Sequence, residues 1–130
     1  MTDVQSVTIM NDFLFSTIMR QEKYCKPLLE LILDVKIKKL VYLNIQQTID
    51  APIINGKSIR LDVYVEDEDH TVYNIEVQTS DKRNLGKRTR FYQAMIDVRL
   101  LESGVDYSAM KASFVIFICN YDPFKKKQLV

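Results

Sequence analysis

Apolar and polar residues alternate in two short segments of the chain, residues 59–65 and residues 73–78. Alternation with a period of two predicts strands whose apolar side chains share one face. The polar and acidic stretch at residues 66–70 predicts a turn, so the two segments should pair as a hairpin. This hairpin constrains the fold most strongly, because its pairing decides which side chains of the polar face can meet.

Acidic residues lie inside these strands, where packing alone gives no reason for a charge. Pairing residue 62 with residue 74, or equally with residue 76, leaves Asp62, Glu76 and Gln78 on one face, since a shift of two residues preserves facing. Carboxylates this close repel each other unless a cation or a shared proton lies between them. We therefore predict a metal site on a half-exposed face, formed by Asp62 and Glu76. The alternative, an ordinary hairpin with surface acids, better suits the turn residues 66–69.

Helical spacing of apolar residues occurs in two segments. Residues 11–34 predict two helices or one broken helix, with Pro27 beginning the second segment rather than lying inside a helix. Residues 84–102 predict a longer helix that ends before Gly104. The apolar face of that helix would contain Phe91, Ala94, Met95, Val98 and Leu101.

Two further segments predict strands. Residues 41–49 have strand composition, and Pro52 with Asn55–Gly56 predicts a turn into the hairpin, which gives a three-stranded meander. Residues 113–120 form a continuous apolar run, which is typical of a strand buried on both faces of a sheet. The predicted order is therefore helix, three strands, helix, strand.

Length and composition predict one compact domain spanning residues 1–130. The chain is 47% hydrophobic and 27% charged, so it can bury a sizeable core. Its net charge of +1 excludes a global basic field, and nucleic-acid binding would need a local patch. Cys25 and Cys119 do not form a zinc motif, and no export signal or membrane span is visible, which predicts a reduced, cytoplasmic protein.

A run of basic residues follows the hairpin. It contains no acid between Asp81 and Phe91, and its members are Lys82, Arg83, Lys87, Arg88 and Arg90. Such a cluster can hold a phosphate backbone independently of base identity, although a solvated helix face is the alternative. Arg88 and Tyr92 are four residues apart, so both side chains should leave one face of the helix.

Several of these segments together resemble the PD-(D/E)XK nuclease superfamily, in particular its Rpn-like branch of recombination-promoting nucleases and transposases. The resemblance covers about residues 11–124. The segments that carry it are Asn11–Asp12–Phe13–Leu14–Phe15, Leu61–Asp62–Val63, Ile75–Glu76–Val77–Gln78, Arg88 and Tyr92. It implies an α/β fold with a restriction-endonuclease-like α-β-β-β-α-β core, a mixed sheet flanked by helices.

The resemblance also implies roles for single residues. Asp62, Glu76 and the carbonyl of Val77 would bind Mg²⁺ or Mn²⁺, and Gln78 stands where the superfamily usually has lysine. Gln78 could orient the attacking water, while Arg88 or Lys57 would supply the missing positive charge. Asp12, Arg88 and Tyr92 would be auxiliary, although Asp12 could instead cap the first helix.

The predicted function is that of a metal-dependent DNA endonuclease linked to recombination or mobile elements, with DNA as partner and homo-oligomerisation left open. One alternative is a module that keeps the fold for nucleic-acid binding or assembly without catalysis, which Gln78 and Ser16 favour. Another is a complete transposase. The stop at Val130 predicts the N-terminal part of a longer protein.

Overall fold

The computed structural model describes residues 12–43, 48–49, 59–101 and 103–125. A four-stranded sheet in the order β1-β4-β5-β6 lies at its centre. The strands are β1 (Leu40–Tyr42), β4 (Val63–Asp67), β5 (Val72–Gln78) and β6 (Ser113–Cys119). The β1–β4 and β4–β5 pairs are antiparallel and the β5–β6 pair is parallel, which gives the predicted mixed sheet.

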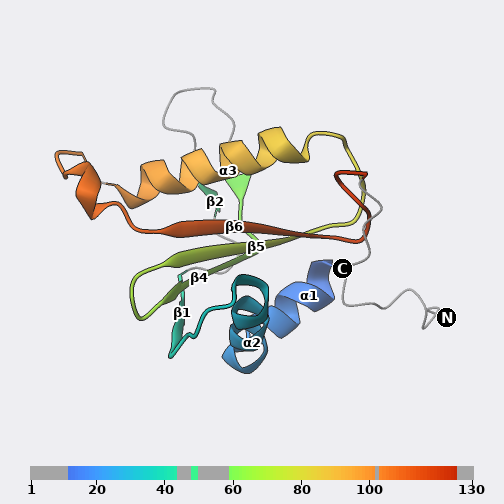
Figure 1. The fold of residues 1–130 in the computed structure, drawn as a ribbon, viewed down its shortest axis with the longest axis horizontal. Coiled ribbons are helices and arrows are strands. Elements are labelled where there is room, and N and C mark those ends of the chain that lie inside the picture. Colours follow the sequence, from blue (N-terminus) through green and yellow to red (C-terminus); the bar gives the residue numbers. More distant parts are fainter. Residues whose placement is uncertain (1–11, 44–47, 50–58, 102, 126–130) are drawn as a thin grey trace.

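Three helices flank this sheet. Helices α1 (Asp12–Met19) and α2 (Glu22–Leu33) lie on one side, and α3 (Leu85–Leu100) lies on the other (Figure 1). A short 3-10 turn, η2 (Tyr107–Ala109), lies between α3 and β6. This arrangement confirms the predicted α/β class. None of the described helices is long and apolar enough to cross a membrane.

Two hydrophobic clusters lie on opposite faces of the sheet. The first lies under α1 and α2 and contains Phe15, Met19, Cys25, Leu29, Ile37, Leu40, Val63, Val65, Tyr73, Ile75 and Val77. The second lies under α3 and contains Ile59, Leu61, Tyr64, Val72, Tyr92, Met95 and Ile96. The alternating side chains of β5 enter both clusters, so β5 is buried along its whole length.

The first helical segment breaks earlier than expected. Gln21 is extended and separates α1 from α2, whereas Pro27 lies inside α2. Proline removes one intrahelical donor, but α2 packs Cys25 and Leu29 into the core on either side of it. The prediction that Pro27 begins a segment was therefore wrong, because tertiary packing outweighs its local preference.

The predicted strands 41–49 and 59–65 are each divided between two sheets. A separate two-stranded sheet pairs β2 (Thr48–Ile49) with β3 (Ile59–Arg60). The chain leaves that sheet at Leu61–Asp62 before β4 begins. Ile59 and Leu61 consequently contact the α3 side, whereas Val63 and Val65 contact the α1–α2 side. The expected single apolar face over residues 59–65 was therefore wrong.

Two burial predictions differ from the structure. β6 packs side chains on both faces of the sheet as predicted, but it is an edge strand of the described sheet, its side chains are only partly buried, and Phe114 is 40% exposed. Of the expected apolar face of α3, only Met95 is buried, and it is joined by Tyr92 and Ile96. The buried stripe of α3 is thus rotated about the helix axis relative to the predicted face, in which Phe91, Ala94 and Val98 are exposed.

Candidate active site

The β4–β5 hairpin brings the two predicted metal-binding acids together. Val63 lies opposite Ile75, and one residue further this register puts Asp62 level with Glu76. Of the two registers left open by the sequence, the one that pairs residue 62 with residue 76 fits, and the one with residue 74 does not. The Asp62 N–H donates a 2.7 Å hydrogen bond to Oε2 of Glu76. The main chain of Asp62 is therefore in direct contact with the Glu76 carboxylate.

This contact depends on the break between β3 and β4. Asp62 is a bend residue between the two strands, so its N–H is not part of a ladder and can bind a side chain. Glu76 lies on the continuous strand β5, whose backbone is paired with β6 along its whole length. A rigid strand and a bend that departs from the sheet thus supply one acid each.

Glu76 is buried, which differs from the half-exposed face that the sequence predicts. Its side chain is only 3% exposed, and Asn74 and Gln78 on the same face are buried with it. This face lies under α3, which adds Tyr92, Met95 and Ile96 to it. The loss of solvent, and next the negative charge of Asp62, raise the pKa of Glu76 to about 8.

Hydrogen bonds to Glu76 oppose this rise of its pKa only in part. The Asp62 N–H and the Nδ2 of Asn74 both donate to Oε2, and the Arg88 charge also favours the ionised form. No ion pair to Glu76 is found among the described residues; the hairpin ion pairs described are those of Glu66. A buried acid without an ion-pair partner has the donor chemistry of a cation site.

Gln78 is engaged at both ends of its amide. Its Oε1 accepts a 2.5 Å hydrogen bond from Nη1 of Arg88, and its Nε2 donates to the Ser80 carbonyl at 2.8 Å. Arg88 also donates to the Tyr92 hydroxyl at 3.3 Å and lies over the rings of Tyr92 and Phe117. The predicted helix pair Arg88 and Tyr92 therefore reaches the strand that carries Glu76.

The backbone of Val77 faces the same region. The Gln78 carbonyl bonds to Asn120 N–H beyond β6, and backbone groups alternate in direction along a strand. The Val77 carbonyl thus points away from β6, toward the β4 side of the sheet. Val77 lies beyond Val63, the first residue of β4, so β4 does not cover this carbonyl. Its side chain belongs to the opposite cluster, so only this main-chain oxygen can serve the site.

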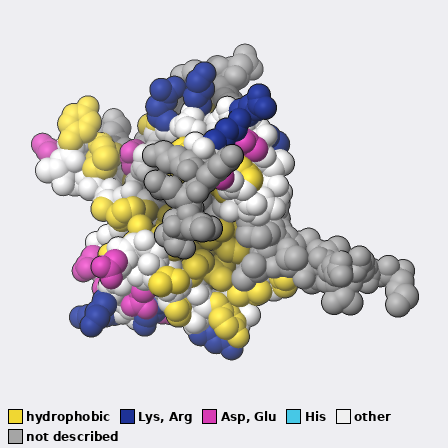
Figure 2. Space-filling view, turned by 45° about the vertical axis from the view of Figure 1, so that its right-hand side comes forward, with side chains coloured by type: hydrophobic (Ala, Val, Ile, Leu, Met, Phe, Trp, Pro, Cys, Tyr) yellow, Lys and Arg dark blue, Asp and Glu magenta, His cyan; other side chains and the backbone are white. Residues whose placement is uncertain are grey.

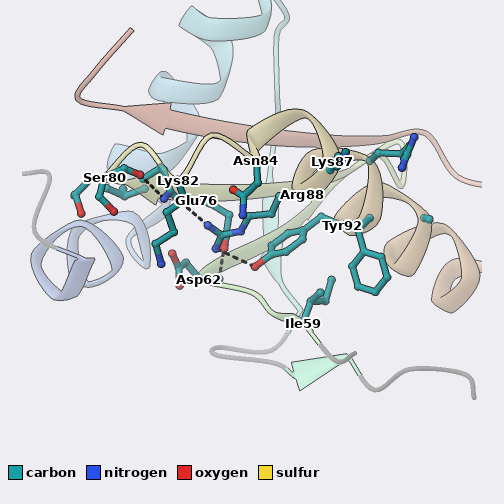
Figure 3. A pocket seen from close by; sticks show the side chains of 15 residues that line it. Ile59, Asp62, Glu76, Ser80, Lys82, Asn84, Lys87, Arg88 and Tyr92 are labelled. Atoms are coloured by element: carbon teal, nitrogen blue, oxygen red, sulfur yellow. Dashed lines mark hydrogen bonds between the residues drawn. The ribbon is translucent and has the colours of Figure 1, made fainter. Parts of the chain in front are cut away.

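A cavity of about 1070 Å³ joins these groups to the basic segment. Figure 3 shows Asp62, Glu76, Arg88 and Tyr92 along it, with Lys82 and Lys87 nearby. Arg90 also lines the cavity, whereas Arg83 does not and uses its backbone N–H to bind Asp81 Oδ1 at 2.8 Å. Lys and Arg side chains also gather at the top of the molecule, on the α3 side (Figure 2).

Several predicted groups cannot be placed. The side chain of Asp12, the residue Lys57 and the turn at Pro52 and Asn55–Gly56 lie outside the described residues. Within the described ranges, no group of three or more His, Cys, Asp and Glu side chains could hold a metal ion. A metal site in this part of the chain would therefore combine two carboxylates with main-chain oxygen.

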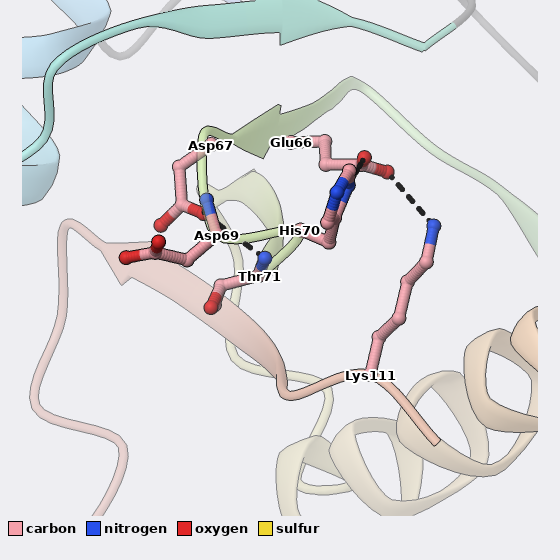
Figure 4. A network of polar contacts seen from close by, with 6 residues as sticks. All are labelled: Glu66, Asp67, Asp69, His70, Thr71 and Lys111. Carbon is pink, nitrogen blue, oxygen red and sulfur yellow. Dashed lines mark hydrogen bonds and ion pairs between the residues drawn. The ribbon is translucent and has the colours of Figure 1, made fainter. Parts of the chain in front are cut away.

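A second acidic cluster lies at the turn end of the same hairpin (Figure 4). Glu66 pairs with His70 at 2.8 Å and with Lys111 at 3.2 Å. Asp67 Oδ1 accepts from the N–H groups of Asp69 and Thr71, and its Oδ2 accepts from the Tyr73 hydroxyl. His70 has a positive φ of 65°, a conformation that favours glycine. These acids complete a turn.

Asn74 is a site residue to which the sequence assigns no role. It is fully buried and donates to both Glu76 Oε2 and the Val63 carbonyl. Asparagine is depleted in strands, so its position between Tyr73 and Ile75 was an available signal. The contact itself required knowledge of the register.

Comparison with known proteins gives one family. The family model of the PD-(D/E)XK nuclease family transposases matches residues 9–130. No curated protein and no solved structure matches the chain.

Proposed function

Because the chain belongs to the PD-(D/E)XK nuclease family of transposases, we propose that it is an endonuclease that hydrolyses DNA at the Asp62–Glu76 cavity with Mg²⁺ or Mn²⁺. The observation that carries this proposal is a buried Glu76 carboxylate in contact with Asp62 and without an ion-pair partner among the described residues. The family of transposases supports a link to mobile elements, and a role in recombination and a cytoplasmic location are part of the proposal.

The donor set fits a hard divalent cation. Asp62, the Oε1 atom of Glu76 and the Val77 carbonyl would hold it, because Mg²⁺ and Mn²⁺ prefer oxygen ligands. When bound, such a cation would activate water and offset negative charge on the phosphate. The protein itself shields the Glu76 carboxylate from solvent, since Glu76 is surrounded by β5, Asp62 and the side chains of α3.

Arg88 would supply the positive charge that lysine provides in much of the superfamily. Gln78 and Tyr92 hold the guanidinium beside Glu76, and a positioned cation stabilises charge that develops on a phosphate. Both ends of the Gln78 amide are engaged by the protein, since its Oε1 accepts from Arg88 and its Nε2 donates to the Ser80 carbonyl. We assign Gln78 to positioning Arg88.

The substrate would approach along the basic segment. Lys82, Lys87 and Arg90 line the cavity next to the acids, and they would contact the phosphate backbone without reading bases. Arg83 would act from the adjoining loop.

The proposal is tested by nicking of supercoiled plasmid in Mg²⁺ or Mn²⁺. Asp62→Asn should reduce the nicking rate by at least about 100-fold, because loss of a ligand should exceed the 10–100-fold effect of an outer-shell change. Asp69→Asn is the matched control, since Asp69 is an exposed acid of the turn on the same hairpin. Equal rates for Asp62→Asn and the parent would overturn the assignment.

Gln78→Lys tests the second part of the proposal. Lysine would remove the acceptor for Arg88 and add a cation beside it, so the rate should fall by about 10-fold or more. A preserved or higher rate would mean that Gln78 does not act through Arg88.

The second candidate is a DNA-binding or assembly module without useful catalysis. Gln78 favours it, because its amide is occupied and carries no charge. Calorimetric titration with Mg²⁺ or Mn²⁺ separates the two candidates, since a module that only binds DNA has no need of the metal. DNA binding without metal uptake would select the module.

A further inference from the structure

The two oxygens of Glu76 are not equivalent. Oε2 accepts the Asp62 N–H at 2.7 Å and the Nδ2 of Asn74 at 3.1 Å, and no described donor contacts Oε1. Two hydrogen bonds occupy the lone pairs that a carboxylate oxygen directs toward ligands. Glu76 is therefore held so that one oxygen is used by the protein and the other is presented to the cavity.

The orientation of Asn74 is fixed by its surroundings. Its Nδ2 lies between two acceptors, the Val63 carbonyl at 3.2 Å and Glu76 Oε2. Turning the amide over would place Oδ1 against both acceptors, which is repulsive. The Oδ1 atom is buried and has no partner among the described residues. An unpaired buried acceptor is unfavourable, so Oδ1 offsets part of the stability that the two Nδ2 hydrogen bonds contribute.

We propose that Asn74 is a positioning residue that keeps Glu76 a one-oxygen ligand and thereby selects a small octahedral cation over Ca²⁺. This inference rests on the proposed metal site of Asp62 and Glu76. Mg²⁺ and Mn²⁺ accept single carboxylate oxygens in an octahedron, whereas Ca²⁺ is larger and often takes both oxygens of one carboxylate. With Oε2 held by Asn74 and Asp62, Glu76 cannot turn to offer both.

The experiment compares Mn²⁺ and Ca²⁺ binding by calorimetry in the parent and in Asn74→Leu. Leucine keeps the volume approximately, removes the donor to Oε2 and also removes the unpaired Oδ1. The ratio of Mn²⁺ to Ca²⁺ affinity should fall by about 5-fold or more, and urea unfolding of the metal-free protein shows whether the variant is folded. Should Asn74→Leu fail to fold, Asn74→Ser offers the smaller change and should lower the same ratio.

Tyr64→Phe is the matched control. Tyr64 pairs directly with Asn74 across the hairpin, and its buried hydroxyl has neither a partner nor a contact to Glu76 within the described part of the chain. It should leave the affinity ratio unchanged. An unchanged ratio in folded Asn74→Leu would overturn the role of Asn74. Failure of the parent to bind either cation, or Mn²⁺ binding that survives Asp62→Asn, would instead overturn the proposed metal site.

Discussion

The two ends of the β4–β5 hairpin carry acids in opposite physical states. At the turn end, Glu66 pairs with His70 and Lys111, and the hydrogen bond from His70 leads the causes that lower its pKa. At the other end, Glu76 is buried against Asp62, and loss of solvent raises its pKa to about 8. The turn end therefore stabilises the charge of Glu66, whereas burial at the other end disfavours the charge of Glu76.

A high density of acids is a poor indicator of a metal site in this hairpin. Residues 66–69 form the densest acidic run of the chain, yet the contacts described there complete a turn and its ion pairs. The two acids in contact at the other end are 14 residues apart in sequence and meet only through the register. A buried glutamate, Glu76, for which the described residues provide no ion-pair partner, distinguishes this second end.

The largest expected effect is a pH-dependent stability that comes from the buried end. The pKa of Glu76 is about 8 when folded and near the ordinary 4.5 when unfolded. A raised folded pKa gives stability that is complete below pH 4.5 and is lost as pH rises through 8. The free energy of unfolding of the metal-free protein should therefore fall by about 3 kcal/mol between pH 5 and 8, at ~1.4 kcal/mol per pKa unit.

Urea unfolding at a series of pH values measures this effect. Glu76→Gln keeps an acceptor for Asp62 N–H but cannot ionise, so its stability should vary much less over the same range. Glu66→Gln, at the turn end, should retain the parental dependence. A parental slope in Glu76→Gln would show that another group causes it.

The next effect in size concerns the cations beside the two acids. Replacing Arg83, Lys87 and Arg90 together by alanine should weaken binding of unrelated DNA duplexes by about 10-fold or more and reduce the salt slope by about 2–3, at ~0.9 per phosphate contact. Fluorescence anisotropy at several salt concentrations gives both values.

Three exposed lysines between α2 and β1 form the charge-matched control. Lys36→Ala, Lys38→Ala and Lys39→Ala together remove the same charge but lie outside the cavity. If both triple variants lower the salt slope equally, the DNA is attracted by overall charge and the basic segment is only a solvated helix face.

The smallest effect belongs to the turn end. Lys111→Ala removes one ion pair of Glu66 at the surface, and such pairs contribute about 0–1 kcal/mol. Because the folded pKa of Glu66 is lowered, its contribution is present above the unfolded pKa and is lost as pH falls through the folded pKa. Thermal unfolding at pH 7 and at pH 3 should therefore show a small difference only at pH 7. A loss of unfolding free energy above about 2 kcal/mol would contradict the assignment of this ion pair to the surface.

The hairpin and its shared polar face could be predicted because a period of two leaves few alternatives. The break at Leu61–Asp62 could not, since Ile59 and Leu61 on one face and Val63 and Val65 on the other are all apolar. Alternation alone cannot reveal a change of face within such a run. The same ambiguity hid the edge position of β6, whose sequence is as apolar as that of a central strand.

The α3 stripe was misassigned for a related reason. Phe91 and Val98 have the spacing of a buried face, but Tyr92 and Ile96 have it equally well and are the ones that pack. The bonds of Arg88 to Gln78 and of Asn74 to Glu76 are tertiary contacts. They depend on how α3 and β4 lie against β5, which no local pattern specifies.

The parallel pairing of β5 with β6 has a kinetic consequence. Ile75 pairs with Ile116, and α3 lies between these two residues in the sequence. Val63 and Ile75 pair within a hairpin, so the hairpin closes a much shorter loop. We expect Asp62 and Glu76 to meet early in folding and Glu76 to lose its solvent late, when α3 and β6 dock. Raising the pH should then act mainly by speeding unfolding, with little change in the rate of folding.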